Sequence, residues 1–134
     1  SATLKLICDH DKEIKEFKSE EYWEIFAKLL FIQNDIEYHL SDNSHSVLTR
    51  AFDVHYDIIM TQPFSDFNKR TARMVMNWFL IQNGYRPIVF NKKTDANEYT
   101  NALRERVQGN RRAYTEYMEK CMLRTQKEII SILR

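Results

Sequence analysis

The residues most able to do chemistry lie in one short polar segment, 61–73. Pro63 ends the preceding helix, and the next helix is expected to start at 68–71, because an apolar stripe follows there. Arg70 and Arg73 then face the same side of the first helical turn. The free N–H groups and the positive dipole end of a helix attract anions, and cations at that end are unfavourable unless an anion binds. The segment therefore predicts a phosphate site.

Asp66 lies just before this helix start and supplies a carboxylate. Mg²⁺ binds carboxylate and phosphate oxygens, so Asp66 would hold Mg²⁺ between itself and a bound phosphate. In the alternative interpretation, Arg70 and Arg73 form a solvated face or pair with a neighbouring helix. The chain has no glycine-rich P-loop and no dinucleotide-binding fingerprint. The residues alone thus indicate an anion site with one metal ligand and leave the alternative open.

Length and composition describe the scaffold that must position this segment. The chain has 134 residues, of which 43% are hydrophobic, 29% are charged, two are glycine and two are proline. This length fits a single domain, residues 1–134, with one core. So few turn-forming residues argue against an all-β fold. The net charge of +1 provides no basic excess of the kind that nucleic-acid binders show, so no nucleic-acid partner is expected.

Compartment and cysteine chemistry can also be inferred from the sequence. No apolar run approaches the roughly 20 residues of a membrane span, and no secretory signal pattern is found. Cys8 and Cys121 are far apart, and Cys121 lies on an apolar helical stripe. We expect Cys121 to be a buried free thiol, while a disulfide stays open. These features favour a cytoplasmic protein with no membrane partner, and leave secretion into a host cell as an effector open.

Apolar residues recur at helical spacing along the chain, which predicts an all-α bundle. The predicted helices run over about 20–40, from 47 to near 60, from 68–71 to 82, from Asp95 to 108 and from 111 onward. Asn83-Gly84 and Gly109 are helix stop signals, and Asp95 with Glu98 resembles a capping box. The first helix is expected to bury one stripe: Trp23, Phe26, Ala27, Leu30 and Phe31.

The run from 62 to 73 resembles the signature of the Fic/Doc (Fido) family. That signature reads H-P-F-x-[D/E]-G-N-G-R-x-x-R, with A-N-K-R for G-N-G-R in the Doc branch, and this chain reads Q-P-F-S-D-F-N-K-R-T-A-R. His55-Tyr56 upstream and residues 76–77, 84–87 and 108–110 downstream also match, so the resemblance covers about 45–123. It implies a Fic/Doc-type helical bundle with the motif loop between two central helices.

The resemblance also implies a reaction. Family members transfer AMP from ATP, or a phosphoryl group in the Doc branch, to a hydroxyl of a target protein, here a Ser, Thr or Tyr. It implies ATP and Mg²⁺ as cofactors, with Asp66 as the metal ligand and Asn68 in contact with the nucleotide phosphates. Arg70 and Arg73 would bind the outer phosphates, with an ion pair that anchors the site as the alternative role of Arg73.

Two departures from the signature bear on activity. The family's histidine accepts the proton of the attacking hydroxyl, and this chain has Gln62 at that catalytic position. A neutral amide cannot act as a general base, and losing one costs roughly a hundredfold to ten-thousandfold in rate. Phe67 replaces glycine or alanine and is expected to narrow the phosphate cradle or redirect the loop. The positions of Phe67 and Lys69 are both expected to bind the nucleotide, and Lys69 favours the Doc branch. Phe64 is expected to be buried and to fix the loop.

Three functions follow as hypotheses. The first is a catalytically impaired family member that still binds a nucleotide or a protein, the second an active protein adenylyltransferase or Doc-like kinase, and the third a non-enzymatic protein-binding scaffold. No complete inhibitory [S/T]-x-x-x-E-[G/N] helix is found; Thr115 with Glu119 comes nearest. An antitoxin-like inhibitor chain, as in toxin–antitoxin pairs, and a homo-oligomer are therefore open as partners. We expect His55 to be a hydrogen-bonded core residue, and His39 and His45 to be surface or cap-region residues without a metal.

Overall fold

The structure, a computed structural model, describes residues 19–133, and all the regular elements in this part of the chain are helices. They are α2 (Ser19–Ser41), α3 (Val47–Thr61), α4 (Asn68–Gln82), α5 (Lys92–Val107) and α6 (Arg111–Leu133). The predicted all-α class is confirmed, and the motif lies between α3 and α4 as expected. Cys8 lies outside the described residues. None of the helices within 19–133 has the length and hydropathy needed to cross a membrane.

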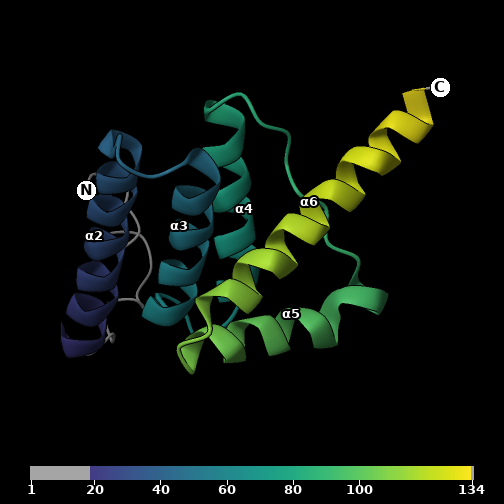
Figure 1. Ribbon diagram of the computed structural model, residues 1–134. Coiled ribbons are helices and arrows are strands. Elements are labelled where there is room, and N and C mark those ends of the chain that lie inside the picture. The colour runs from purple at the N-terminus through teal and green to yellow at the C-terminus, as the bar shows by residue number, and fades with distance from the viewer. Residues whose placement is uncertain (1–18, 134) are drawn as a thin grey trace.

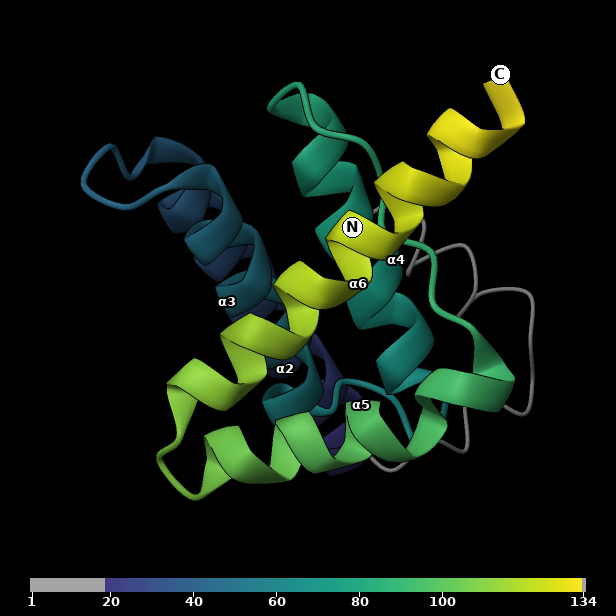
Figure 2. The same cartoon turned by 45° about the vertical axis from the view of Figure 1, so that its right-hand side comes forward.

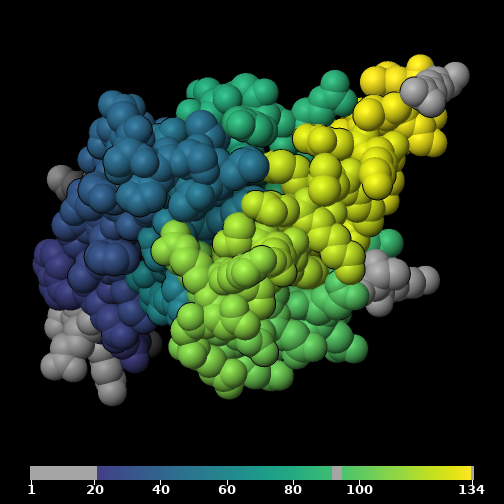
Figure 3. Space-filling model, in the orientation of Figure 1, coloured from purple at the N-terminus to yellow at the C-terminus, as the bar shows by residue number. Residues whose placement is uncertain are grey.

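The helices form two groups that share one core. Figure 1 shows α2, α3 and α4 side by side, with α6 passing in front of α4 and α5 running beneath α6. The views of Figures 2 and 3 show that the C-terminal end of α6 extends beyond the rest of the molecule. The largest side chains with less than 2% exposure come from α3, α4 and α6: Phe52, Ile58, Met76, Phe79, Leu80, Tyr114 and Met118. Cys121 is buried beside them as a free thiol, as predicted.

Most helix ends follow the predicted signals. Ser46 caps α3 by accepting a hydrogen bond from the N–H of Thr49 at 3.1 Å. Gly84 and Gly109 follow α4 and α5 with φ of 83° and 98°, a left-handed conformation that glycine adopts without a steric penalty. Since α4 begins at Asn68, the predicted start at 68–71 is confirmed.

The predicted start of α5 at Asp95 is wrong, because the helix begins three residues earlier, at Lys92. The Asp95 carboxylate accepts hydrogen bonds from the N–H of Asn91, just before the helix, and from both terminal nitrogens of Arg124 at 2.7 Å. The hydrogen bonds from Arg124 lower the pKa of Asp95. From inside the first turn, Asp95 thus caps the N–H of Asn91 and also joins α5 to α6.

The predicted buried stripe of the first helix is also wrong in large part. Trp23, Leu30 and Phe31 are 60%, 46% and 55% exposed. The face of α2 that packs toward the core instead carries Ile32 and Ile36. Apolar residues surround much of this helix, so helical spacing fits more than one stripe, and only the contact with α3 selects among them.

One acidic side chain on α3 connects the two helix groups. Asp53 accepts hydrogen bonds from Arg106 at 2.9 Å and from Arg111 at 2.6 Å. The Arg106 guanidinium also lies over the rings of Tyr56 and Tyr114, with 3.9 Å and 4.9 Å to the ring centroids. Its side chain is only 10% exposed, so its charge depends on Asp53 for neutralisation.

Asp53→Asn is therefore expected to lower the free energy of unfolding by about 2 kcal/mol, because it leaves Arg106 without a charged partner. Urea denaturation measures the change. The control is Glu116→Gln, which breaks an exposed pair with Arg112 (62% and 88% exposed side chains) and should change stability by less than about 0.5 kcal/mol. Equal small changes in both variants would contradict the role given to Asp53.

Candidate functional site

The motif loop is closed by backbone contacts of one amide side chain. Asn68 accepts a hydrogen bond from the N–H of Phe64 at 3.0 Å and donates one to its carbonyl at 2.8 Å. Pro63 is buried, whereas the Phe64 side chain is 43% exposed. The prediction that a buried Phe64 fixes the loop is wrong, because the Asn68 amide does this through the Phe64 backbone. The contact of Asn68 with nucleotide phosphates stays a prediction.

Both ends of the loop adopt left-handed backbone. Gln62 follows α3 with φ of 47°, and its N–H donates to the carbonyl of Ile58 at 3.1 Å. Phe67 precedes α4 with φ of 65°. This is the conformation that the glycine of the family signature would adopt without strain, and a side chain there costs about 1–2 kcal/mol.

The start of α4 combines several features that favour the binding of an anion. Phe67 occupies the N-cap position and makes no side-chain capping hydrogen bond, and the first turn holds no acidic residue. The Lys69 and Arg70 side chains stand on this same turn and are exposed. Uncapped N–H groups, the helix dipole and two cations all favour a negative ligand at this point.

All of the predicted site residues border one cavity of about 460 Å³. Its lining residues are Gln62, Asp66, Phe67, Asn68, Lys69, Arg70 and Arg73, together with Ile59 and Ser65. Pockets for small ligands in proteins span roughly 300–1,000 Å³, so the space suits a phosphate chain. The fold therefore brings the motif residues together in one concave site, although their roles there are a separate question.

The two arginines of the motif contact aromatic rings. The guanidinium of Arg70 lies 5.1 Å from the centroid of Phe67. That of Arg73 lies 5.6 Å from the centroid of Phe90 and 5.4 Å from that of Tyr99. Within residues 19–133, Arg73 forms no ion pair with a carboxylate, so the alternative role as an anchoring ion pair is not observed. A guanidinium held over a ring keeps its charge and its N–H groups available to an anion.

Asp66 is suitable as a ligand for a hard cation. Its side chain is exposed at the cavity, and one carboxylate oxygen accepts a hydrogen bond from the N–H of Phe67 at 2.7 Å. The second oxygen is left for Mg²⁺, which binds proteins through one or two carboxylates and takes its remaining ligands from phosphate and water. The residues present thus fit the metal that the sequence implies.

A second cavity of about 490 Å³ adjoins the first, and Lys69 and Arg73 line both. The segment between α4 and α5, which includes Phe90, forms one wall of this second cavity. Tyr99 of α5 forms another wall. Asn77 holds this segment in place by bonding the N–H and the carbonyl of Ile88 at 2.8 Å and 3.0 Å. Sequence reasoning missed this cavity, because its residues are distributed over 69–100.

A buried hydrogen-bond network lies behind this wall. His55 is fully buried and contacts the hydroxyls of Tyr114 and Tyr99 at 2.7 Å and 2.6 Å, which confirms the predicted core histidine. Tyr114 donates its single proton to the carbonyl of Phe52 at 2.8 Å. His55 Nδ1 must therefore donate to Tyr114, and Nε2 must accept from Tyr99. No sequence signal singles out Tyr99 and Tyr114 as its partners.

His55 is held in its neutral form. Burial, followed by the charges of Arg73 and Arg106, lowers its pKa to about 3. Both of its ring nitrogens are engaged, and no part of the side chain is exposed. His55 therefore cannot replace the proton-accepting histidine that the motif lacks at Gln62.

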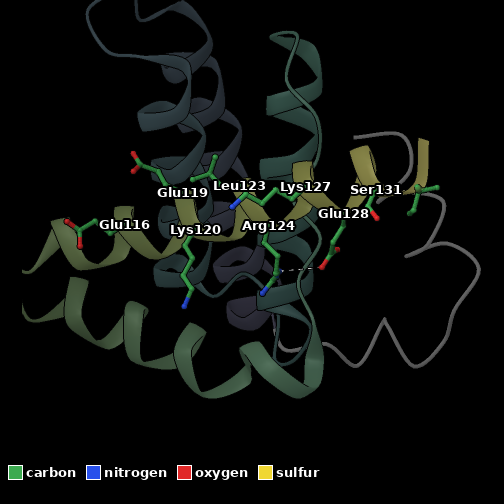
Figure 4. A pocket seen from close by; sticks show the side chains of 9 residues that line it. Glu116, Glu119, Lys120, Leu123, Arg124, Lys127, Glu128 and Ser131 are labelled. Atoms are coloured by element: carbon green, nitrogen blue, oxygen red, sulfur yellow. Dashed lines mark ion pairs between the residues drawn. The ribbon is translucent and has the colours of Figure 1, made fainter. Parts of the chain in front are cut away.

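A larger hollow, of about 910 Å³, lies elsewhere, along the exposed side of α6 (Figure 4). Every lining residue belongs to this one helix: Glu116, Glu119, Lys120, Leu123, Arg124, Lys127, Glu128, Ser131 and Ile132. None of them belongs to the motif, and the hollow has no opposing wall within residues 19–133. It is therefore not part of the candidate site.

Comparison with known families decides the relationship. The model of the Fic/DOC family matches residues 7–80. This chain belongs to the Fic/DOC family. The family match covers the motif loop and α4 as far as residue 80, and it begins and ends earlier than the stretch 45–123 that resembles the family in sequence.

Several relatives of this Fic/DOC chain are adenylyltransferases of animals. It is 34% identical to protein adenylyltransferase fic-1 of Caenorhabditis elegans over 83 residues, 58% of this chain and 16% of the relative. It is 34% identical to protein adenylyltransferase Fic of Aedes aegypti over 71 residues, 53% of this chain and 14% of the relative. The chain thus spans about a sixth of the length of these relatives.

Proposed function

We propose that this chain is a nucleotide-binding Fic/DOC domain in which transfer of AMP from ATP to a protein hydroxyl is strongly impaired. The observation that supports this proposal is the cavity of about 460 Å³ that the predicted site residues line at the start of α4. There, three cations and an uncapped helix end are present, but the position of the proton acceptor holds Gln62. The name shared by the relatives favours AMP as the transferred group.

In this proposal, Lys69, Arg70 and Arg73 bind the phosphates of ATP together with the N–H groups at the start of α4. Bound Mg²⁺, held by Asp66, would neutralise phosphate charge and favour departure of pyrophosphate. The adjoining cavity, with Phe90 and Tyr99 in its walls, offers aromatic surface for the nucleoside.

The step that suffers is proton removal from the target hydroxyl. In AMP transfer, the hydroxyl oxygen bonds to the α-phosphorus, pyrophosphate leaves, and the hydroxyl proton must go to a base. The Gln62 amide can hydrogen-bond the hydroxyl but cannot take its proton, so the proton goes to water. We infer slow transfer to a Ser, Thr or Tyr hydroxyl of a protein target.

A Doc-like phosphoryl transfer is the second candidate, because Lys69 stands at the position where the Doc branch has lysine. The same residues would then bind ATP, and ADP would leave instead of pyrophosphate. Labelling ATP at the α-phosphate or at the γ-phosphate distinguishes the two reactions, since only the transferred group stays on the target.

Isothermal titration of the chain with ATP and Mg²⁺ tests the binding part of the proposal. We expect the unaltered chain to bind and Arg70→Ala to weaken binding at least about tenfold, because one charge-assisted phosphate contact contributes about 1.5–3 kcal/mol. Arg70 is exposed and forms no ion pair with any described residue, so its removal should leave the fold intact.

The matched control is Arg112→Ala, which removes an exposed arginine on α6 that, among the described residues, forms an ion pair with Glu116 alone. It should bind ATP like the unaltered chain. Absence of binding by the unaltered chain would overturn the proposal and favour a protein-binding scaffold. Equal loss in both variants would mean that ATP responds to net charge rather than to this site.

A further inference from the structure

A second group of potential metal ligands lies between α2 and α3, formed by different residues from the motif. Asp35 and His39 are one turn apart on α2, and Asp57 faces them from α3. The Nε2 atom of His39 lies 3.5 Å from Oδ1 of Asp35 and 3.4 Å from Oδ2 of Asp57. One ligand atom from each of the three residues lies within 4.8 Å of the others.

The polar atoms of this cluster lack good partners. His39 is 7% exposed, and its Nε2 atom faces the two carboxylates. The second oxygen of Asp35 is buried and has no hydrogen-bond partner among the described residues. The two contacts of His39 Nε2 exceed the 2.7–3.2 Å of a well-formed hydrogen bond. Buried polar groups are rarely left so poorly satisfied unless something else binds them.

We propose that Asp35, His39 and Asp57 bind one divalent transition-metal ion of the Zn²⁺ class. Zn²⁺ binds imidazole nitrogen and carboxylate oxygen at about 2.0–2.2 Å, and tetrahedral ligands at that distance lie about 3.3–3.6 Å apart. The two distances from His39 Nε2 have this length. The histidine ligand argues against Mg²⁺ and Ca²⁺, because these ions prefer sites formed by oxygen ligands alone. Water would complete the coordination.

The charges around the cluster favour the binding of a cation. Among the described residues, no lysine or arginine forms an ion pair with Asp35 or Asp57, whereas the nearby Asp53 is bound by Arg106 and Arg111. A cation bound between the carboxylates of Asp35 and Asp57 would offset their mutual repulsion.

The ion would have a path from solvent and a structural effect. The Asp57 side chain is 30% exposed, so a cation can reach the cluster without opening the core. Bound there, the ion would fix α2 to α3, the helix that ends just before Gln62. The sequence-based expectation of a surface position for His39 is wrong, because these contacts bury it, although it does lie in the last turn of α2.

Titration of the metal-free chain with ZnCl₂, followed by calorimetry and by thermal unfolding, tests the proposal. We expect one ion per chain and a raised melting temperature. Asp57→Asn should weaken binding at least about tenfold and remove the rise, since a lost ligand costs about that much or more. Asp35→Asn, on the other helix, should do the same, so the test survives if either variant fails to fold. Circular dichroism establishes which of them folds.

The matched control is His45→Gln, which alters an exposed histidine that contacts the carboxylate of Asp42 at 2.7 Å. This histidine–carboxylate pair has no third ligand within residues 19–133, so the variant should bind Zn²⁺ like the unaltered chain. Co²⁺ in place of Zn²⁺ should give the visible absorption of a tetrahedral site, lost in Asp57→Asn. No binding by the unaltered chain, or unchanged binding in both aspartate variants, would overturn the proposal.

Discussion

Changing Gln62 to histidine and Phe67 to glycine together is expected to raise protein labelling from α-labelled ATP by about a hundredfold to ten-thousandfold. The histidine restores a proton acceptor next to the cavity that Lys69, Arg70 and Arg73 line. The glycine removes a ring from the same cavity and suits the φ of 65° found at position 67. A radiolabel-transfer assay with cell lysate measures the rate.

The single variants separate the two contributions. Gln62→His alone should give part of the gain, because Phe67 still lines the cavity, and Phe67→Gly alone should give little, because no base is present. Phe67 is 57% exposed, so its loss should not destabilise the fold; thermal unfolding checks this. Full activity in Gln62→His would refute the obstructing role of Phe67. No gain in a double variant that still binds ATP would refute the impairment hypothesis.

The second large effect concerns the pH dependence of stability. His55→Gln is expected to lower the free energy of unfolding by about 1–3 kcal/mol at pH 8, because it disrupts the bonds to Tyr99 and Tyr114. This difference should then shrink by about 1.4 kcal/mol per pH unit below 6.5 and vanish near pH 5. Urea denaturation of both chains at several pH values measures it.

The sign follows from the lowered pKa of His55. The unfolded chain takes up a proton on this histidine below its ordinary pKa of 6.5, while the folded chain stays neutral down to about 3. Acid therefore stabilises the unfolded state of the unaltered chain and weakens its fold across this range. Glutamine does not titrate, so the variant lacks this loss. Other groups, such as Asp35, titrate in both chains and cancel in the difference, and a constant difference from pH 8 to 5 would contradict the burial of a neutral His55.

Local signals in the sequence were sufficient for the helix order and for the position of the motif loop between α3 and α4. Pro63, Gly84 and Gly109 end helices for reasons of backbone geometry that act within a few residues, so the motif could be placed between two helices. The signature itself identified the residues that border the cavity. These residues lie close together because they belong to one turn between two consecutive helices. Predicting that arrangement requires no knowledge of contacts with distant parts of the chain.

Features that depend on contacts between helices could not be predicted. The partners of His55 are 44 and 59 residues away in the sequence, and their spacing does not predict these contacts. His39 is buried because it packs against Asp57 on the next helix. Helical spacing alone predicts only that His39 lies near the end of a helix. The buried face of α2 and the closure of the loop by Asn68 likewise depend on neighbours that the sequence does not reveal.

The sharing of Lys69 and Arg73 by two adjoining cavities has a consequence for ligand fragments. Adenosine and pyrophosphate, added separately, would each contact the guanidinium of Arg73, which lies over Phe90 and Tyr99. Each fragment would favour a different orientation of this side chain. Their separate affinities should therefore not be additive, and one fragment should alter the apparent affinity of the other. A whole nucleotide would bridge the two spaces and orient that side chain only once.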